Sequence, residues 1–292
     1  MGNHPISQKN KNYIFETKLF HNFKKLKKEG GLRTKRIFKK SSSSKPLITI
    51  ITVVKNNSET IKKCIKSVIN QNYSNIEHVI IDGGSSDNTV SILKKYSNHI
   101  DYWISEKDNG LYDAMNKGLK LSQGEYIGIL NSDDTYKKNS LNIILKYFKK
   151  FKNIDFVFGT VFKGRILSGF WPKKILWKLN IYSAHSVGFF IKKNSQKKIG
   201  FYDTKFKYCA DRDLFYRMIV KAKMKGKATN KKELIGYFKE GGFSESLNFL
   251  GRLLEETRIR LKNKQNIILI IILFFVHLIY QLRKFFIKEK KI

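Results

Sequence analysis

Apolar positions recur with two different spacings through the middle of the chain. Short runs rich in β-branched and aromatic residues are typical of buried strands, and they cover Leu47–Val54, Ile76–Ile81, Tyr102–Ile104 and Tyr126–Leu130. Between these runs apolar residues fall three or four positions apart, which predicts helices over Ile61–Ile69, from Asp87 onward and over Leu111–Leu121. Strands and helices that alternate at this spacing predict an α/β domain with a mostly parallel sheet.

The second half of the chain continues in the same way. It predicts strands over Phe156–Phe162, Ser186–Ile191 and Leu234–Phe238. It predicts helices over Asn139–Phe151, from Asp211 onward and over Ser246–Lys264. We therefore expect one α/β domain over residues 47–246. Ligands of such sheets bind at the carboxyl ends of the strands.

The amino-terminal region differs from this domain. Residues 1–46 are rich in lysine and end in four serines before Lys45 and Pro46. This composition predicts a solvated basic extension with a linker, and a short amphipathic helix around Phe20 and Phe23 is the alternative. Residues 1–44 contain no apolar stretch of the kind found in signal peptides, so we expect no signal peptide.

Residues 247–292 predict carboxyl-terminal helices with an apolar, membrane-associated segment over residues 267–287. Its uninterrupted part, Ile267–Leu282, has sixteen residues, fewer than the ~20 that span a bilayer. Lysine and arginine flank it, which favours a helix embedded in or lying on a membrane. A buried core helix is the alternative, and the sequence leaves open whether the segment spans the membrane.

The chain is strongly basic. Its 58 Lys and Arg residues outnumber 23 Asp and Glu, giving a net charge of +35, which attracts polyanions. The lysines are scattered through every segment, so we expect an anionic membrane surface rather than nucleic acid as the partner. The two cysteines, Cys64 and Cys209, fall on apolar positions and predict core thiols in a reducing, cytosolic compartment.

Polar loops follow the predicted strands where a ligand would sit. The first contains Asn56, and the second begins Asp82-Gly83, where glycine permits close approach to a ligand. The third holds polar residues before and along the next helix, namely Asp108, Gly110, Asp113 and Asn116. We expect these loops to contact a nucleotide or its phosphates.

The fourth loop is Asn131-Ser132-Asp133-Asp134. Carboxylates at the end of a buried strand are costly unless a cation lies beside them, and oxygen ligands suit Mg²⁺ or Mn²⁺. An ordinary turn stabilised by its own side chains is the alternative.

Together and in this order, these segments resemble the family 2 glycosyltransferases with the GT-A fold, a Rossmann-like sheet flanked by helices. The likeness covers roughly residues 47–246 and is greatest to the bacterial branch that includes colanic acid and other exopolysaccharide transferases. The resemblance implies that Asp82 contacts the nucleotide, and that Asp134, with Asp133 second, holds the metal. Asn131 stands where many relatives have the first Asp of the metal motif, and it is expected, with Asp133, to contact the nucleotide sugar.

The resemblance also implies a general base near Ala210-Asp211-Arg212-Asp213. We assign this role to Asp211, with Asp213 as runner-up; helix capping is the alternative for both. His185 resembles a histidine near the acceptor in this branch, although a histidine beside an apolar strand is often structural.

The expected activity is inverting transfer of a sugar from a nucleotide-diphosphate sugar to a glycan or lipid-linked acceptor, in bacterial surface polysaccharide synthesis. The expected location is the cytoplasmic face of the inner membrane, peripheral or monotopic. Two alternatives remain open. One is a sugar-phosphate nucleotidyltransferase, which usually carries a glycine-rich loop after its first strand, and the other is a non-catalytic, basic nucleic-acid-binding protein.

Overall fold

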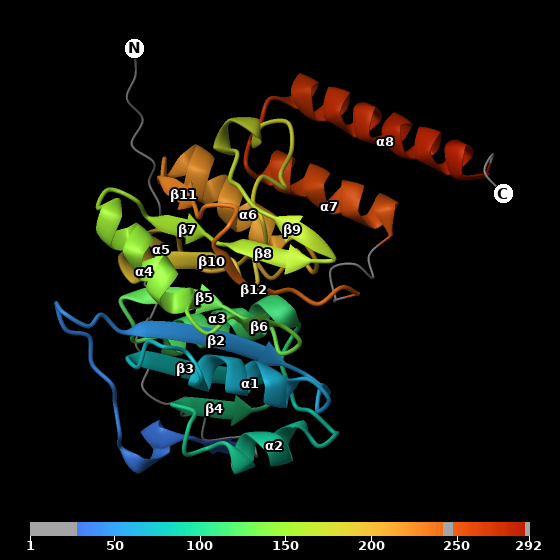
Figure 1. Ribbon diagram of the computed structural model, residues 1–292. Coiled ribbons are helices and arrows are strands. Elements are labelled where there is room, and N and C mark those ends of the chain that lie inside the picture. Colours follow the sequence, from blue (N-terminus) through green and yellow to red (C-terminus); the bar gives the residue numbers. More distant parts are fainter. Residues whose placement is uncertain (1–27, 242–247, 290–292) are drawn as a thin grey trace.

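A computed structural model describes residues 28–241 and 248–289 of the chain, with side chains to residue 280 (Figure 1). An eight-stranded sheet runs through the molecule in the order β1-β4-β3-β2-β5-β10-β7-β11. Its four central parallel strands carry the predicted pattern, and they are β2 (Ile48–Val54), β3 (Ile76–Asp82), β4 (Tyr102–Ser105) and β5 (Tyr126–Ile129).

Alternate residues of β2 enter two different cores. Ile50 packs with the apolar side of helix α1 (Ile61–Ile69), whereas Ile51 packs with helix α3 (Leu111–Leu121) on the other face of the sheet. This follows from the two-residue period of a strand. Gly118 permits the close packing of α3, because a Cβ there would collide with the Ile51 side chain. Helix α2 (Thr89–Lys95) completes the first half.

A parallel majority was predicted, and four of the seven pairings in the large sheet are parallel, while the other three are antiparallel. Strand β10 (Phe189–Lys192) runs antiparallel to β5 and to β7 (Phe156–Phe158), and β11 (Gly226–Ala228) is parallel to β7. The run predicted as one strand over residues 156–162 is interrupted at Gly159. Its second part, β8 (Thr160–Lys163), enters a different sheet.

That second sheet has four strands in the order β6-β12-β8-β9. Besides β8 it contains β6 (Thr135–Tyr136), β9 (Arg165–Leu167) and β12 (Leu234–Tyr237). Three helices of the second half flank the sheets, namely α4 (Ser140–Lys150), α5 (Lys193–Ile199) and α6 (Ala210–Tyr216). A π-helical turn over Arg217–Lys221 follows α6.

Residues 28–46 differ from the predicted solvated extension. Strand β1 (Lys28–Gly30) pairs antiparallel with β4 at the edge of the large sheet. After it, Arg33 in a 3₁₀ turn (Leu32–Lys35) is 1% exposed, forms an ion pair with Glu77, and donates to the Leu121 carbonyl at 2.9 Å. The alternative amphipathic helix around Phe20 and Phe23 lies outside the described residues.

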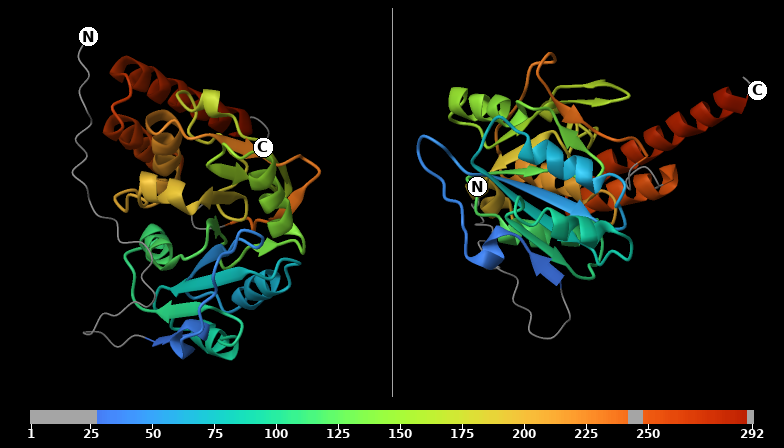
Figure 2. Two further views of the ribbon diagram at one scale, coloured as in Figure 1. Left: turned by 90° about the vertical axis from the view of Figure 1, so that its left-hand side faces the viewer. Right: turned by 60° about the horizontal axis from the view of Figure 1, so that its bottom comes forward.

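Helices α7 (Phe249–Lys262) and α8 (Ile267–Glu289) follow the domain and lie side by side (Figures 1 and 2). Ile270 and Leu273 of α8 are buried, whereas Ile268, Ile272 and other apolar residues of α8 are exposed. Within residues 28–241 and 248–289, no helix has both the length and the apolar character needed to cross a bilayer.

Candidate active site

A cleft of about 600 Å³ opens at the carboxyl ends of β2 and β5, and both halves of the domain contribute to it. The first half supplies Lys55, Asn57, Asp108 and Gly110, and the end of β5 supplies residues 131–133. The second half supplies residues 182–186, 207–209, 211 and 212. The site therefore lies at the strand ends, as expected for an open α/β sheet.

Asp133 and Asn131 both line this cleft. The Asn131 Oδ1 atom is buried and has no hydrogen-bond partner among the described residues. A buried, unpaired acceptor is costly, and a cation beside it would remove that cost. Since the loop also carries Asp133, the donor set fits Mg²⁺ or Mn²⁺.

Asp134, expected to be the stronger metal ligand, does not line the cleft. Its side chain is 1% exposed, and its two oxygens accept hydrogen bonds from Ser186 Oγ at 2.5 Å and from the Lys239 amide at 2.8 Å. Burial, together with the neighbouring charge of Asp133, raises the pKa of Asp134 to about 7. Of the two carboxylates, Asp133 lines the cleft and Asp134 does not.

The described residues contain no cluster of three or more His, Cys, Asp or Glu side chains able to hold a metal ion. Mg²⁺ commonly binds through one or two carboxylates and takes its remaining ligands from water and substrate phosphates. Asp133 and Asn131 fit a cation of that kind, shared with a diphosphate.

Asp211 faces the same cleft from the start of α6. Its Oδ1 accepts a hydrogen bond from the Tyr112 hydroxyl at 2.9 Å, and its Oδ2 accepts one from Tyr182 at 2.6 Å. Tyr112 belongs to α3 and Tyr182 to the segment before β10, so residues distant in sequence fix the orientation of this carboxylate. The two hydroxyl donors occupy one oxygen each and hold the carboxylate in a fixed position.

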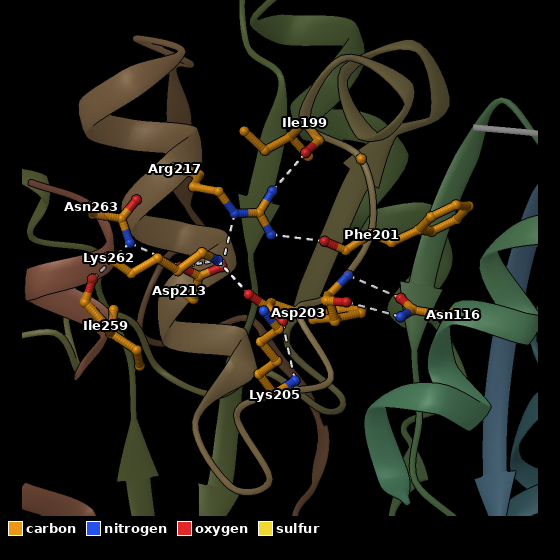
Figure 3. Close-up of polar contacts among 12 residues, drawn as sticks. Asn116, Ile199, Phe201, Asp203, Lys205, Asp213, Arg217, Ile259, Lys262 and Asn263 are labelled. Carbon is orange, nitrogen blue, oxygen red and sulfur yellow. Dashed lines mark hydrogen bonds and ion pairs between the residues drawn. The ribbon is translucent and has the colours of Figure 1, made fainter. Parts of the chain in front are cut away.

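Asp213, the runner-up for the same role, lies elsewhere (Figure 3). It is fully buried and does not line the cleft. Its carboxylate accepts hydrogen bonds from Arg217 at 2.8 Å, from Lys262 at 2.9 Å and from Asn263 at 2.9 Å. These partners use the oxygens of Asp213 to join α6 to the end of α7, which is a structural role.

Comparison with known proteins identifies the family. The family model for glycosyl transferase family 2 matches residues 49–221, which contain most of this cleft. This chain belongs to glycosyl transferase family 2. A glycosyltransferase is therefore the enzyme class, ahead of nucleotidyl transfer and of non-catalytic nucleic-acid binding.

The relatives of this glycosyltransferase match parts of its length. An uncharacterized glycosyltransferase of Mycobacterium tuberculosis is 39% identical over 95 residues, 32% of this chain and 36% of the relative. One from Rickettsia typhi is 29% identical over 194 residues, 62% of this chain and 61% of the relative. The chondroitin synthase of Escherichia coli is 36% identical over 117 residues, 39% of this chain but only 17% of that protein.

Solved structures share the fold of this glycosyltransferase. Residues 1–349 of TarS from S. aureus align with a TM-score of 0.57 and 15% identity over 74% of this chain and 64% of that one. The mannosyltransferase PcManGT from Pyrobaculum calidifontis, solved with GDP-Man and Mn²⁺, aligns with a TM-score of 0.58 and 15% identity over 80% of this chain and 70% of its own.

Only some of the predicted nucleotide-binding residues of the glycosyltransferase line the cleft. Asp108 and Gly110 do so, and the Asp108 carboxylate accepts a hydrogen bond from the Gly110 amide at 3.0 Å. Burial raises the pKa of Asp108. Gly110 has φ of 111°, a conformation that favours glycine, and it leads directly into α3.

The other predicted nucleotide contacts support the loops instead. Asp82 is buried and accepts hydrogen bonds from Ser85 and Ser105. Asn56 accepts a bond from the Ser86 amide at 2.8 Å and so joins the loops after β2 and β3. A side chain at Gly83, which follows Asp82, would collide with Asp108. This glycine therefore allows the loop after β3 to pack closely against the loop after β4.

Two predicted contacts on α3 are also structural. Asp113 accepts a hydrogen bond from the Asn109 amide at 3.0 Å near the start of the helix. Asn116 donates to the Tyr202 carbonyl and accepts from the Tyr202 amide, both at 2.9 Å (Figure 3). Neither lines the cleft. Asn116 is buried against the segment that holds Tyr202, whereas Asp113 is partly exposed beside the loop before α3.

His185 lines the cleft of the glycosyltransferase and bonds through Nε2 to the Tyr202 hydroxyl at 2.7 Å. Burial lowers its pKa, which favours the neutral imidazole.

Basic side chains around the cleft were not predicted. They come from separate segments of the chain and are Lys55, Lys163, Lys207, Arg212 and Arg252. Five basic side chains against the three carboxylates of Asp108, Asp133 and Asp211 give the cleft lining an excess of positive charge, which attracts an anionic ligand. In a chain with 58 Lys and Arg, sequence alone gives no signal that distinguishes these five.

Proposed function

We propose that this glycosyltransferase moves a sugar from a nucleoside-diphosphate sugar to a hydroxyl group of a glycan or lipid-linked acceptor, with inversion at the anomeric carbon. The observation that carries this proposal is the cleft shared by Asp133 and Asp211, which five Lys and Arg residues also line. TarS has been solved with UDP-GlcNAc and PcManGT with GDP-Man. A nucleoside-diphosphate sugar is the class common to both.

In the proposed reaction, Asp211 accepts the proton of the acceptor hydroxyl. The acceptor oxygen then bonds to the anomeric carbon, the bond from that carbon to the diphosphate oxygen breaks, and the nucleoside diphosphate leaves. The hydroxyls of Tyr112 and Tyr182 hold Asp211 in one orientation. A base in that position typically contributes 10²–10⁴-fold to the rate.

Asp133 and the side-chain oxygen of Asn131 would hold Mg²⁺ or Mn²⁺. Such a cation, when bound, stabilises the negative charge that develops on the departing diphosphate. Asp134 supports the loop from behind through Ser186 and the Lys239 amide. Lys55, Arg212 and the other basic residues of the cleft lining bring and hold the diphosphate.

Synthesis of a bacterial surface polysaccharide is the proposed setting. The relatives named chondroitin synthase and hyaluronan synthase fit this class of product, and the exopolysaccharide branch remains part of the proposal. We further propose a peripheral or monotopic location at the cytoplasmic face of the inner membrane, through the exposed apolar side chains of α8.

The direct test is incubation of the full chain with a panel of nucleotide sugars and Mn²⁺, with slow nucleotide release and thermal stabilisation as readouts. One donor, or a few related ones, should stabilise the protein and release nucleotide only when Mn²⁺ or Mg²⁺ is present. No response to any nucleotide sugar would overturn the proposal.

A further inference from the structure

The segment Trp171–Lys178, between β9 and the residues that line the cleft, exposes large apolar side chains. Trp171 is 48% exposed, Leu176 40% and Trp177 56%. Three lysines in the same segment are also exposed, namely Lys173, Lys174 and Lys178. Neither the cleft nor the proposed mechanism uses these side chains.

The exposed tryptophans belong to an ordered turn. A 3₁₀ turn over Pro172–Lys174 begins the segment, and the Trp171 amide donates to the Ile181 carbonyl at 2.8 Å. Ile175 and Leu179 are buried, at 3% and 1% exposure. The fold therefore holds the two indole rings outward on a fixed support.

The support is supplied by the end of α7. Arg260, 2% exposed, donates to the Leu176 carbonyl at 2.7 Å and to the Trp177 carbonyl at 3.1 Å. Gln265, between α7 and α8, also donates to the Leu176 carbonyl at 2.7 Å. The Trp171–Lys178 segment is thus fixed to the connection from which α8 begins.

Lys178 of the segment also lies close enough to α8 to act on His277. Burial lowers the pKa of His277, and the positive charges of Arg260 and Lys178 lower it further. Along α8 the exposed apolar residues repeat with helical spacing, and they are Ile267, Ile268, Ile271, Ile272, Phe275, Val276, Ile279 and Tyr280. The exposed tryptophans therefore lie beside α8, near its start, and this apolar stripe runs along the side of the helix away from His277.

We infer that Trp171–Lys178 is a second membrane contact, which works with α8 to dock the protein on an anionic bilayer. This inference rests on the proposed membrane location and adds a second element to it. Tryptophan is favoured at the boundary between the apolar and polar parts of a bilayer. Lysines beside it attract anionic headgroups. Charge complementarity thus selects an anionic lipid surface as the occupant.

The Trp171–Lys178 segment leads directly into the lining of the cleft. The chain passes from Lys178 through the buried Leu179 to Asn180 and Tyr182, which line the cleft. A bilayer that contacts Trp177 is therefore a few residues from the side of the cleft that holds Asp211.

Vesicle flotation of the full chain tests the inference. We compare vesicles that contain phosphatidylglycerol with vesicles of phosphatidylcholine alone, and wild type with Trp171→Ser/Trp177→Ser and with Lys173→Glu/Lys174→Glu/Lys178→Glu. Each variant should bind phosphatidylglycerol vesicles about tenfold or more weakly than wild type. Burial of a large apolar side chain in the bilayer strengthens binding by more than this factor, and so does the attraction of three lysines to anionic headgroups.

Matched controls remove similar groups at the other end of the molecule, where α1 and α2 lie (Figure 1). Ile37→Ser/Ile69→Ser removes two exposed apolar residues, and Lys62→Glu/Lys94→Glu/Lys95→Glu makes the same change of net charge. Both controls should bind vesicles more tightly than the corresponding variants. Unchanged thermal unfolding shows that each variant is folded.

Tryptophan fluorescence gives an independent readout. The chain has three tryptophans, and Trp103 is buried at 2% exposure. Emission from Trp171 and Trp177 should shift to shorter wavelength on vesicle binding and be quenched by brominated lipids. Unshifted emission in the vesicle-bound protein would overturn the inference.

The outcomes separate this inference from the proposed location. If Ile268→Asp/Ile272→Asp on α8 weakens vesicle binding and the tryptophan variant does not, the second contact is wrong and the location stands. If neither weakens binding, both are wrong. If light scattering shows a dimer that only the tryptophan variant dissociates, with vesicle binding unchanged, the segment contacts a second copy and the inference fails.

Discussion

The hydroxyl of Tyr182 donates a 2.6 Å hydrogen bond to Oδ2 of Asp211. The hydroxyl of Tyr112 occupies the other oxygen of the same carboxylate. Both tyrosine side chains are buried, and burial raises the pKa of each well above its ordinary value, so both remain protonated donors. This arrangement gives the proposed base two fixed supports.

Tyr182→Phe should lower kcat, because it removes one of the two hydroxyl groups that hold the Asp211 carboxylate in one orientation. A hydrogen bond to a charged group contributes roughly 1.5–3 kcal/mol, which corresponds to a loss of about tenfold or more in rate. Initial rates at saturating donor, compared with those of wild type, measure the effect. A wild-type kcat in the variant would show that Tyr182 does not orient the base.

Asp211→Asn and Asp213→Asn form a matched pair, two residues apart on α6. Asp211→Asn should reduce kcat by about 10²–10⁴-fold with little change in thermal stability, since it removes the proposed base. Asp213→Asn should destabilise the protein by about 3–5 kcal/mol, because Arg217 and Lys262 lose a buried counter-charge. Denaturant unfolding and rate measurements on both variants check this, and the reverse pattern would exchange their roles.

Asp133→Asn should abolish the stabilisation that UDP or GDP gives in the presence of Mn²⁺. The carboxylate faces the cleft, and its loss removes the charged protein ligand of the proposed cation. Thermal unfolding with nucleotide, with and without Mn²⁺, measures the effect. Asp113→Asn is the control, since Asp113 was also predicted to bind the nucleotide but lies outside the cleft lining, and its Mn²⁺ response should equal that of wild type.

His78 predicts a pH dependence of stability that is unrelated to the cleft. Burial, with a smaller contribution from Lys39, lowers its pKa from 6.5 to about 3. Below pH 6.5 the unfolded chain binds a proton at His78 that the folded protein excludes. Stability from this residue is therefore complete above pH 6.5 and is lost, by roughly 1.4 kcal/mol per pH unit, as the pH falls toward 3.

The variant His78→Gln can retain a bond to Thr52, which lies 3.0 Å from Nε2. Its free energy of unfolding, measured in urea between pH 4 and 7, should depend on pH less steeply than that of wild type. Parallel curves for the two proteins would show that His78 is protonated in the folded state.

Sequence periodicity predicted the first half of the fold well. Its strands are buried, and each is joined to the next through a helix or loop close in sequence. The predicted helix over Leu111–Leu121 agrees with α3 at both ends. Pairing in the second half depends on contacts between distant segments, and so β10 was not recognised as antiparallel. Strand β1 was missed for the same reason, since three residues show no period.

The predictions for the site separate along a similar line. Sequence order indicated which loops gather at the strand ends, and Asp108, Gly110, Asn131, Asp133, His185 and Asp211 do line one cleft. The residues next to a side chain in the sequence did not indicate whether that side chain points into the cleft. Asp133 and Asp134 are adjacent, yet one faces the cleft and the other faces Ser186 and Lys239.

The ion pair between Arg33 and Glu77 has a practical consequence for truncated versions of the protein. Glu77 is 1% exposed on the second strand of the family-matched region, whereas its arginine lies sixteen residues before that region begins. A fragment trimmed to residues 49–221 would leave this carboxylate in the interior with no counter-ion. Expression should therefore start upstream of β1 if the recombinant enzyme is to stay folded.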